Sequence, residues 1–267
     1  MDNHHQQAVM NYYQRTTRWF LRFGQTRHTG AIHRALTLPD VVVAVATDTI
    51  HALIGDTLQH LPAGSVVADL GCGVGAALVY MQQRFPLWQI AWGITLSSDQ
   101  AQRAGAMNLP VVQGTFHYLP IMPATVDAAW AIESLIHSDQ PEQFFAEIGR
   151  SMRPGGILII CDDMTNTVTA TAMQQLFQYG WLAPNLVAPQ THSACAQSAG
   201  FKLRAMRDLT AGIHIRAVPN WLARWLGACQ PIWQWSTFLR SMIGSMALQQ
   251  CFADDSIRYI MMVFEKQ

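Results

Sequence analysis

The segment VVADLGCGVGAAL, residues 66–78, constrains the fold more than any other part of the sequence. An apolar run leads to Asp69, glycines follow at alternate positions 71, 73 and 75, and an alanine-rich stretch comes next. Glycine is needed where the backbone takes a positive φ or approaches a ligand closely. A strand, a glycine turn and a helix, in that order, present the free N–H groups of the helix start to a ligand. The segment predicts a ligand-binding turn; a tight turn without a ligand is the alternative.

Short apolar strands alternate with helices on both sides of this turn. The expected strands are residues 65–70, 89–94, 110–113, 126–132 and 156–161, and the expected helices lie near residues 75–85, 97–106 and 141–152. This alternation is typical of a doubly wound, Rossmann-like α/β fold with a mostly parallel sheet. Strands that are apolar almost throughout suit a sheet covered on both faces.

The length of 267 residues fits a single domain, 1–267, with additions before and after the core. We expect an N-terminal helical cap (1–60), a cofactor-binding core (65–163), helical insertions forming a lid with one strand (164–250) and a last strand (256–264). Within the cap, helices are expected at 8–23 and 41–60, although the β-branched run at 41–45 could also be extended.

The lid region divides into several expected elements: a helical insertion at 166–190, a short helix at 191–199, a strand at 201–209 and mostly helix over 212–250. The last of these contains four tryptophans and no acidic residue: Trp221, Trp225, Trp233 and Trp235. We interpret it as a lid over an apolar substrate; a helix lying on a membrane surface is the alternative.

Composition excludes several classes of protein. Half of the residues are hydrophobic and 13% are charged, the reverse of a disordered chain. Seventeen basic and seventeen acidic residues give no net charge, which argues against a nucleic-acid partner. No apolar run reaches the ~18 residues of a transmembrane segment. The first residues lack the pattern of a signal peptide. Five scattered cysteines indicate reduced thiols, a cytoplasmic protein and no metal site formed by the chain.

Arginine and histidine gather near the N-terminus, where no acid occurs between Asp2 and Asp40. The group comprises Arg15, Arg18, Arg22, Arg27, Arg34, His28 and His33. Arginine binds phosphate or carboxylate bidentately, so this group could bind an anion; a solvated helix face is the alternative.

Several motifs resemble one known family. DLGCGVG (69–75) looks like the first motif of class I S-adenosylmethionine-dependent methyltransferases, and MRPGGILII (152–160) resembles their fifth-strand segment. GITLSSDQAQRA (93–104) and AIESLIHS (131–138) are similar to segments of a narrower group, the tocopherol, sterol and prenyl-diphosphate C-methyltransferases. YYQRTTRWFLRFG (12–24), followed by His-Thr-Gly at 28–30, also resembles that group.

The resemblance implies that S-adenosylmethionine is the methyl donor. Asp69, Gly71, Gly73 and Gly75 would surround its amino acid end, and Thr95, Leu96 and Gln100 would flank its ribose and adenine. Thr115 and Phe116 fall where the wider family often has an aspartate beside the adenine, so contact there would be through backbone or stacking. The strand after the glycine turn also ends without the ribose-binding acid of a nicotinamide enzyme, which argues against a dehydrogenase.

Glu133 is the candidate catalytic base, because it follows an apolar strand at the end where such sheets bind ligands. Burial there is expected to raise its pKa. A carboxylate that caps a helix or orients the methionine ammonium is the alternative. His137 could support Glu133 or act as the base itself. A missing base would instead indicate a non-catalytic adenosyl-ligand binder.

We expect methyl transfer to an alkene carbon of an isoprenoid, a prenyl diphosphate, through a carbocation that the base deprotonates. Tyr12, Tyr13 and Trp19 would wall the substrate pocket, or else belong to the core, and Arg27, His28 and Arg34 would bind the diphosphate. Mg²⁺ could join through the diphosphate, although no aspartate-rich magnesium motif occurs. A quinol, a tocopherol-like phenol or a sterol is the alternative acceptor, and homodimerisation through the lid stays open.

Overall fold

The computed structural model describes residues 4–23, 30–216, 219 and 236–267. Its centre is a seven-stranded sheet with the order β3-β2-β1-β4-β5-β7-β6. The strands are β1 (Val66–Leu70), β2 (Gln89–Thr95), β3 (Val111–Gln113), β4 (Val126–Ile132), β5 (Met152–Thr165), β6 (Phe201–Asp208) and β7 (Ile257–Lys266). The expected α/β fold with a mostly parallel sheet is confirmed.

The order in which the strands are added places a crevice at the carboxyl ends of the central strands. From β1 the chain adds β2 and then β3 on one side, and it returns to place β4 and β5 on the other side. All five strands are parallel, whereas β7 runs antiparallel between β5 and β6. Ligands of open α/β sheets bind where the winding reverses, outside the carboxyl ends of the strands. Here that position lies above β1 and β4.

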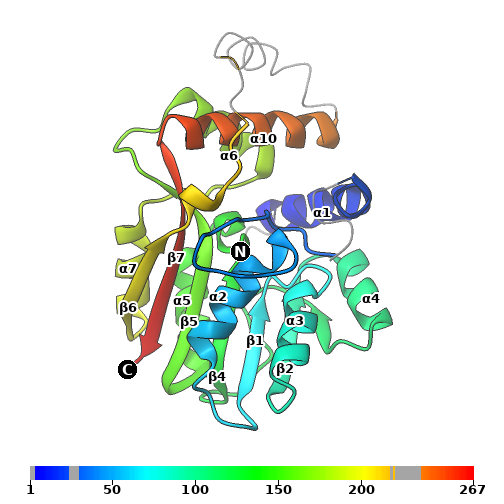
Figure 1. Ribbon diagram of the computed structural model, residues 1–267, viewed down its shortest axis with the longest axis vertical. Coiled ribbons are helices and arrows are strands. Elements are labelled where there is room, and N and C mark those ends of the chain that lie inside the picture. The colour runs from blue at the N-terminus through cyan, green and yellow to red at the C-terminus, as the bar shows by residue number, and fades with distance from the viewer. Residues whose placement is uncertain (1–3, 24–29, 217–218, 220–235) are drawn as a thin grey trace.

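Helices cover both faces and the carboxyl end of the sheet (Figure 1). They are α1 (His4–Phe23), α2 (Thr49–Leu58), α3 (Ala76–Arg84), α4 (Ser98–Ala106), α5 (Pro141–Ser151), α6 (Ala172–Trp181), α7 (Pro189–Ser198) and α10 (Thr237–Ala253). Single turns of 3-10 helix occur at Ala46–Asp48, Leu135–His137 and Thr210–Gly212. In Figure 1, α2 and α3 lie in front of the sheet, and α1, α6 and α10 lie beyond the carboxyl ends of its parallel strands.

The alternation of side chains along β4 separates two apolar cores. Ala128, Trp130 and Ile132 belong to the core shared with α2, α3, α6 and α10. Ala129 and Ala131 point to the other face, into the core shared with α5 and α7. Because both faces of the central strands are buried, their sequences are mostly apolar.

Outside the core, several elements differ from the sequence expectations. Helix is restricted to Ala46–Leu58 within the expected 41–60 segment, because four valines precede it and β-branched side chains disfavour helix. Within 166–190, only Ala172–Trp181 and the first two residues of α7 are helical. In the lid region, α10 begins at Thr237, and the four tryptophans lie outside the described residues. None of the described helices is long and apolar enough to cross a membrane.

Candidate active site

The glycine turn after β1 packs directly against the end of β4. Gly71 has φ +92, and a Cβ on this residue would lie 2.4 Å from the Cβ of Ser134. Its backbone N–H and that of Cys72 both donate to the carbonyl of Ile94, at 2.9 and 2.8 Å. The Ser134 hydroxyl donates to the Leu70 carbonyl at 2.6 Å. These bonds join the ends of β1, β2 and β4. Because a Cβ at position 71 would collide with Ser134, only glycine fits there.

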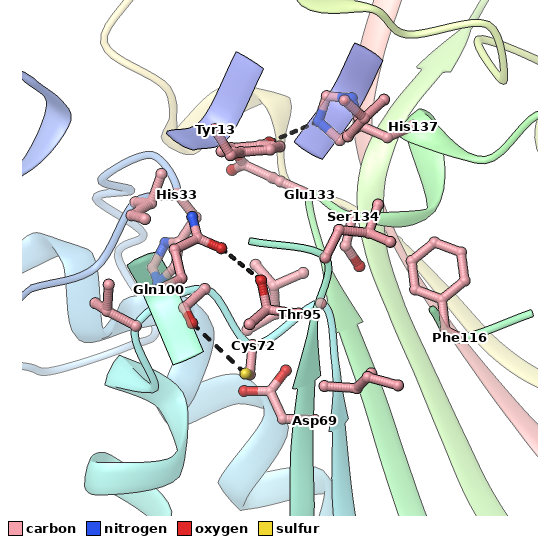
Figure 2. Close-up of a pocket in the computed structure, with 18 of the residues that line it drawn as sticks. Tyr13, His33, Asp69, Cys72, Thr95, Gln100, Phe116, Glu133, Ser134 and His137 are labelled. Carbon is pink, nitrogen blue, oxygen red and sulfur yellow. Dashed lines mark hydrogen bonds between the residues drawn. The ribbon is translucent and has the colours of Figure 1, made fainter. Parts of the chain in front are cut away.

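A cavity opens above these strand ends and below α1 (Figure 2). Most of the side chains expected from the sequence line it: Tyr12, Tyr13, Asp69, Gly71, Gly73, Thr95, Leu96, Gln100, Thr115, Phe116, Glu133 and His137. Their segments are far apart in the sequence, and the carboxyl ends of the parallel strands bring them together. The cavity therefore stands where the topology of the sheet predicts a ligand.

Three of the expected site residues lie outside the cavity lining, and two more lie outside the described residues. Gly75 does not line the cavity, and instead precedes α3 as its N-cap with φ +90. Trp19 is 45% exposed, and its ring lies 4.0 Å from that of Phe238, outside the cavity lining. The remaining three are arginine and histidine residues expected to bind diphosphate. Arg27 and His28 lie outside the described residues. Arg34 is bound to carboxylates beside the cavity.

Arg34 joins Glu133 to Asp163 in a buried group of charges. Its Nε donates to Glu133 Oε1 at 2.9 Å, and its two terminal nitrogens each donate to one oxygen of Asp163 at 2.7 Å. The Arg34 backbone N–H also donates to Glu133 Oε1, at 3.1 Å. The guanidinium lies 4.3 Å from the centre of the Tyr259 ring. Within the described chain, these contacts fall on Oε1 of Glu133 and leave Oε2 for a ligand.

The pKa of Glu133 differs from the sequence expectation. Burial, the largest single influence, raises it, but the Arg34 charge, the nearby His33 and the hydrogen bonds from Arg34 together lower the pKa below its usual value. Glu133 is thus a carboxylate at neutral pH. Its backbone has φ +47, uncommon for a residue with a side chain, and its N–H donates to the Cys161 carbonyl at 2.9 Å. This conformation turns the chain sharply at the end of β4, where strain is typical of functional sites.

A tyrosine and a histidine face each other above Glu133 (Figure 2). His137 Nδ1 lies 3.1 Å from the Leu182 carbonyl, so Nδ1 carries the proton and donates. Nε2 therefore accepts from the Tyr13 hydroxyl, at 2.7 Å. Burial lowers the pKa of His137 to about 4 and raises that of Tyr13 well above its usual value. Both groups are neutral at physiological pH. Their hydrogen bond joins α1 to His137 at the wall of the cavity.

Two histidines, His33 and His51, form a hydrogen-bonded pair on the other side of Glu133. His33 Nδ1 donates to the Arg34 carbonyl at 3.1 Å, so its Nε2 accepts from His51 Nε2 at 2.8 Å. Burial, followed by the nearby His51, lowers the pKa of His33 to about 4. His33 lines the cavity as a neutral side chain. Among Tyr13, His33, Glu133 and His137, the charge is therefore carried by Glu133.

Comparison with known proteins agrees with this geometry. A family model described as "Methyltransferase domain" matches residues 68–160. The chain is 26% identical over 183 residues to the dimethylglycine N-methyltransferase of Parasynechococcus marenigrum, covering 64% of each protein. It is 27% identical over 199 residues to the 2-methyl-6-phytyl-1,4-hydroquinone methyltransferase of Synechocystis sp., covering 69% of this chain and 61% of that protein. The chain thus matches less than two thirds of either relative.

A solved structure of a geranyl diphosphate methyltransferase, in complex with geranyl diphosphate and sinefungin, shares the fold with a TM-score of 0.75. The two chains are 18% identical, and the match covers 98% of each. Residues 68–160 thus form a methyltransferase domain, and the chain has the fold of the class I S-adenosylmethionine-dependent methyltransferases. Its relatives include members of the tocopherol and sterol C-methyltransferase group that its motifs resemble.

The environment of Asp69 in this methyltransferase fits a cationic cosubstrate. Asp69 is 2% exposed, and burial raises its pKa to about 7. No arginine or lysine of the described chain offsets that effect. A buried carboxylate without a cation is costly, and a bound ammonium or sulfonium group would supply the missing charge. S-adenosylmethionine carries both groups, and the adjoining glycine turn gives it room.

The side expected to hold ribose and adenine is already ordered in this methyltransferase. Thr95 Oγ1 donates to Gln100 Oε1 at 2.6 Å, and Gln100 Nε2 donates to Thr17 Oγ1 of α1 at 3.1 Å. Phe116 lines the cavity near Thr115, and its ring offers an apolar face. The hydrogen bond from Gln100 to Thr17 joins α4 to α1 beside the cavity. The cosubstrate would therefore be enclosed by these two helices.

Several lining residues were missed from the sequence: His117, Ser134 and Trp181. Ser134 adjoins Glu133 and could have been inferred from the glycine at position 71. His117 lies two residues beyond Thr115, and its ring bonds to Gln6 of α1 and to Ser138. For Trp181 no sequence signal exists, because its place depends on how α6 packs over the sheet.

Proposed function

We propose that this methyltransferase transfers a methyl group to an alkene carbon of an isoprenoid, with a prenyl diphosphate as the preferred class of acceptor. The observation that carries the proposal is the ionised, buried carboxylate of Glu133 in a cavity walled by aromatic and apolar side chains. S-adenosylmethionine would supply an electrophilic methyl group on a sulfonium. The similarity to a structure that contains geranyl diphosphate supports the choice of acceptor.

The proposed reaction needs a base that stays charged next to an apolar acceptor. The alkene π electrons form the new carbon–carbon bond to the methyl group, and the sulfur retains the electrons of the broken bond. The acceptor is left as a carbocation. Glu133 Oε2 then takes a proton from the neighbouring carbon, and the electrons of that C–H bond form the new double bond. Because such a proton is extremely acidic, the lowered pKa of Glu133 is no obstacle, and the negative charge stabilises the cation.

Aromatic side chains complete the environment that a carbocation requires. Tyr12 and Tyr13 from α1, together with Trp181 from α6, line the cavity on the side opposite the glycine turn. Aromatic faces attract cations by up to about 2 kcal/mol each when water is absent. Water has to be kept away, since it would add to the cation and give an alcohol.

Diphosphate binding depends on residues outside the cavity lining seen here. No arginine or lysine occurs among the lining residues of the described chain, and Arg34 is committed to two carboxylates. We therefore assign the diphosphate to Arg27 and His28, with Mg²⁺ bound through the phosphate oxygens. Arg27→Ala should raise KM for a prenyl diphosphate and leave S-adenosylmethionine affinity unchanged.

A product assay with a matched pair of variants tests the proposal. The protein would be incubated with S-adenosylmethionine, Mg²⁺ and each of isopentenyl, geranyl and farnesyl diphosphate, and mass spectrometry would detect one added methylene. Glu133→Gln should lower kcat by at least about a hundredfold and keep its affinity for S-adenosylmethionine. Glu142→Gln, at an exposed position of α5, is the control and should behave as the wild type.

Two results would contradict the proposal in different ways. Full activity of Glu133→Gln would remove the carboxylate from the mechanism. Methylation of a quinol or a sterol, with no turnover of any prenyl diphosphate, would keep the C-methyltransferase chemistry and replace the acceptor.

A further inference from the structure

Trp181, the last residue of α6, lines the cavity beside Tyr12 and Tyr13. Its indole N–H is shared between two acceptors on α10, the Ser241 carbonyl and the Ser245 hydroxyl, each at 3.2 Å. The hydroxyl of Ser241 is also 2.7 Å from that of Tyr12. One helix, α10, therefore fixes two aromatic cavity walls that come from two other helices.

How far the Trp181 indole reaches into the cavity depends on an unusually close approach of α6 and α10. A Cβ on Gly244 of α10 would lie 2.6 Å from Trp181 Cδ1 and 3.0 Å from the Cα of Gly180. A Cβ on Gly180 of α6 would lie 2.5 Å from the Cα of Gly244. Real Cβ atoms do not approach so closely, so the two backbones meet only because both positions are glycine. Figure 1 shows α6 and α10 stacked beyond the sheet.

The residue after Trp181 connects the same segment to the reaction side of the cavity. Leu182 has φ +54, and its carbonyl accepts from His137 Nδ1 at 3.1 Å. His137 in turn accepts from Tyr13. The indole is thus held at a fixed distance from the wall that contains Glu133 and His137. A rigid aromatic wall at a fixed distance from the reacting centre limits how long a bound apolar chain can be.

We infer that Trp181 is the specificity-determining residue that ends the acceptor side of the cavity and limits acceptor length, and that Gly180 and Gly244 position it. The inference rests on the proposed function, because it assumes an apolar acceptor reaching from Glu133 towards α6. An indole occupies about the space of one to two isoprene units. A smaller side chain would admit a longer acceptor, whereas a displaced indole would exclude one that the wild type accepts.

Two substitutions with opposite expected signs test this. Trp181→Ala lengthens the cavity, so kcat/KM should rise at least about tenfold for the prenyl diphosphate one isoprene unit longer than the wild-type optimum. Gly244→Ala pushes the indole away from α10 towards the cavity, and should shift the optimum to a shorter acceptor. Trp181→Phe keeps an aromatic ring and should give an intermediate profile. If Trp181→Ala does not fold, Trp181→Phe still has to shift in the same direction.

The control is a tryptophan remote from the cavity. Trp88 precedes β2 at the opposite end of the sheet, where its ring stacks on Phe85 at 4.0 Å. Trp88→Ala should keep the wild-type profile of acceptor lengths, even if it lowers stability. Unchanged profiles for both Trp181→Ala and Gly244→Ala would overturn the inference.

A binding series separates failure of the inference from failure of the proposed function. Primary alcohols from hexanol to dodecanol would be titrated calorimetrically into each variant bound to S-adenosylhomocysteine. The longest alcohol that still gains affinity marks the depth of the cavity and requires no turnover. If no prenyl diphosphate reacts, the proposed acceptor is wrong. The inference then stands or falls on whether Trp181→Ala gains affinity at least about tenfold for alcohols too long for the wild type.

Discussion

Replacing Arg34 by methionine tests the buried charge group on which Glu133 depends. Methionine keeps the unbranched apolar stem of arginine, so the change removes mainly the charge and the hydrogen bonds. The Arg34, Glu133 and Asp163 side chains are 13%, 11% and 2% exposed. Water therefore cannot replace the guanidinium, and two carboxylates are left buried without a cation.

The expected loss is large, because breaking a buried ion pair costs more than the pair contributes. Removing one partner of such a pair typically destabilises a protein by about 3–5 kcal/mol. Here one guanidinium makes three side-chain hydrogen bonds to two carboxylates, so we expect the upper part of that range. The triple variant Arg34→Met/Glu133→Gln/Asp163→Asn removes every charge of the group, and should recover most of the loss.

The loss should also depend on pH with a defined sign. In the wild type, burial outweighs Arg34 and raises the pKa of Asp163 to about 6, while burial at Glu133 is exceeded by the combined effect of the Arg34 charge, His33 and the Arg34 hydrogen bonds, which lowers the pKa of Glu133. Without Arg34 both folded-state pKa values rise above their unfolded values. The folded variant then binds more protons than the unfolded chain, so its stability increases as the pH falls. The deficit relative to the wild type must shrink between about pH 8 and about pH 5.5.

Urea unfolding at the two pH values, followed by circular dichroism, gives the free energies. A loss below about 1 kcal/mol, comparable with that of an exposed ion pair, would refute the buried-pair reasoning. So would a loss that is the same at both pH values, since it would come from packing alone.

Three further predictions concern the remaining parts of the site. Asp69→Asn should raise the melting temperature of the ligand-free protein at about pH 8, because burial there costs the carboxylate on the order of a few kcal/mol. The same variant should weaken S-adenosylmethionine binding at least about tenfold in calorimetry, and unchanged affinity would remove Asp69 from the cosubstrate site. Gly71→Ala should abolish that binding, since its Cβ would lie 2.4 Å from Ser134 Cβ; Gly71→Ala/Ser134→Gly should restore part of it. Trp19→Ala should change kcat/KM less than about twofold, as expected for a side chain outside the cavity.

The sequence predicted the core and half of the site because both depend on local patterns. The strand, turn and helix around Gly71 follow from residues within one segment, and the strand ends place Thr95 and Glu133 beside it through the topology of the sheet. The helix after Pro39 was less certain, since β-branched valines are compatible with either state.

The rest of the site depends on contacts between distant segments. The pKa of Glu133 moved in the unexpected direction because Arg34, 99 residues earlier, reaches it. Trp19 was expected either to wall the pocket or to belong to the core, but the rotation of α1 turns Tyr12 and Tyr13 inward and Trp19 outward. Neither the partner of a charge nor the rotation of a helix follows from the periodicity of one chain.

The charges around the cavity explain why no arginine or lysine of the described chain lines it. Two carboxyl groups beside the cavity are paired within the protein, because Arg34 binds both Glu133 and Asp163. Asp69 is the carboxyl that no cation of the described chain approaches. An arginine there would stabilise the empty protein, but it would compete with a cationic ligand for the same carboxylate. A site built to bind a sulfonium beside an apolar acceptor has to accept the cost of one unpaired acid until that ligand arrives.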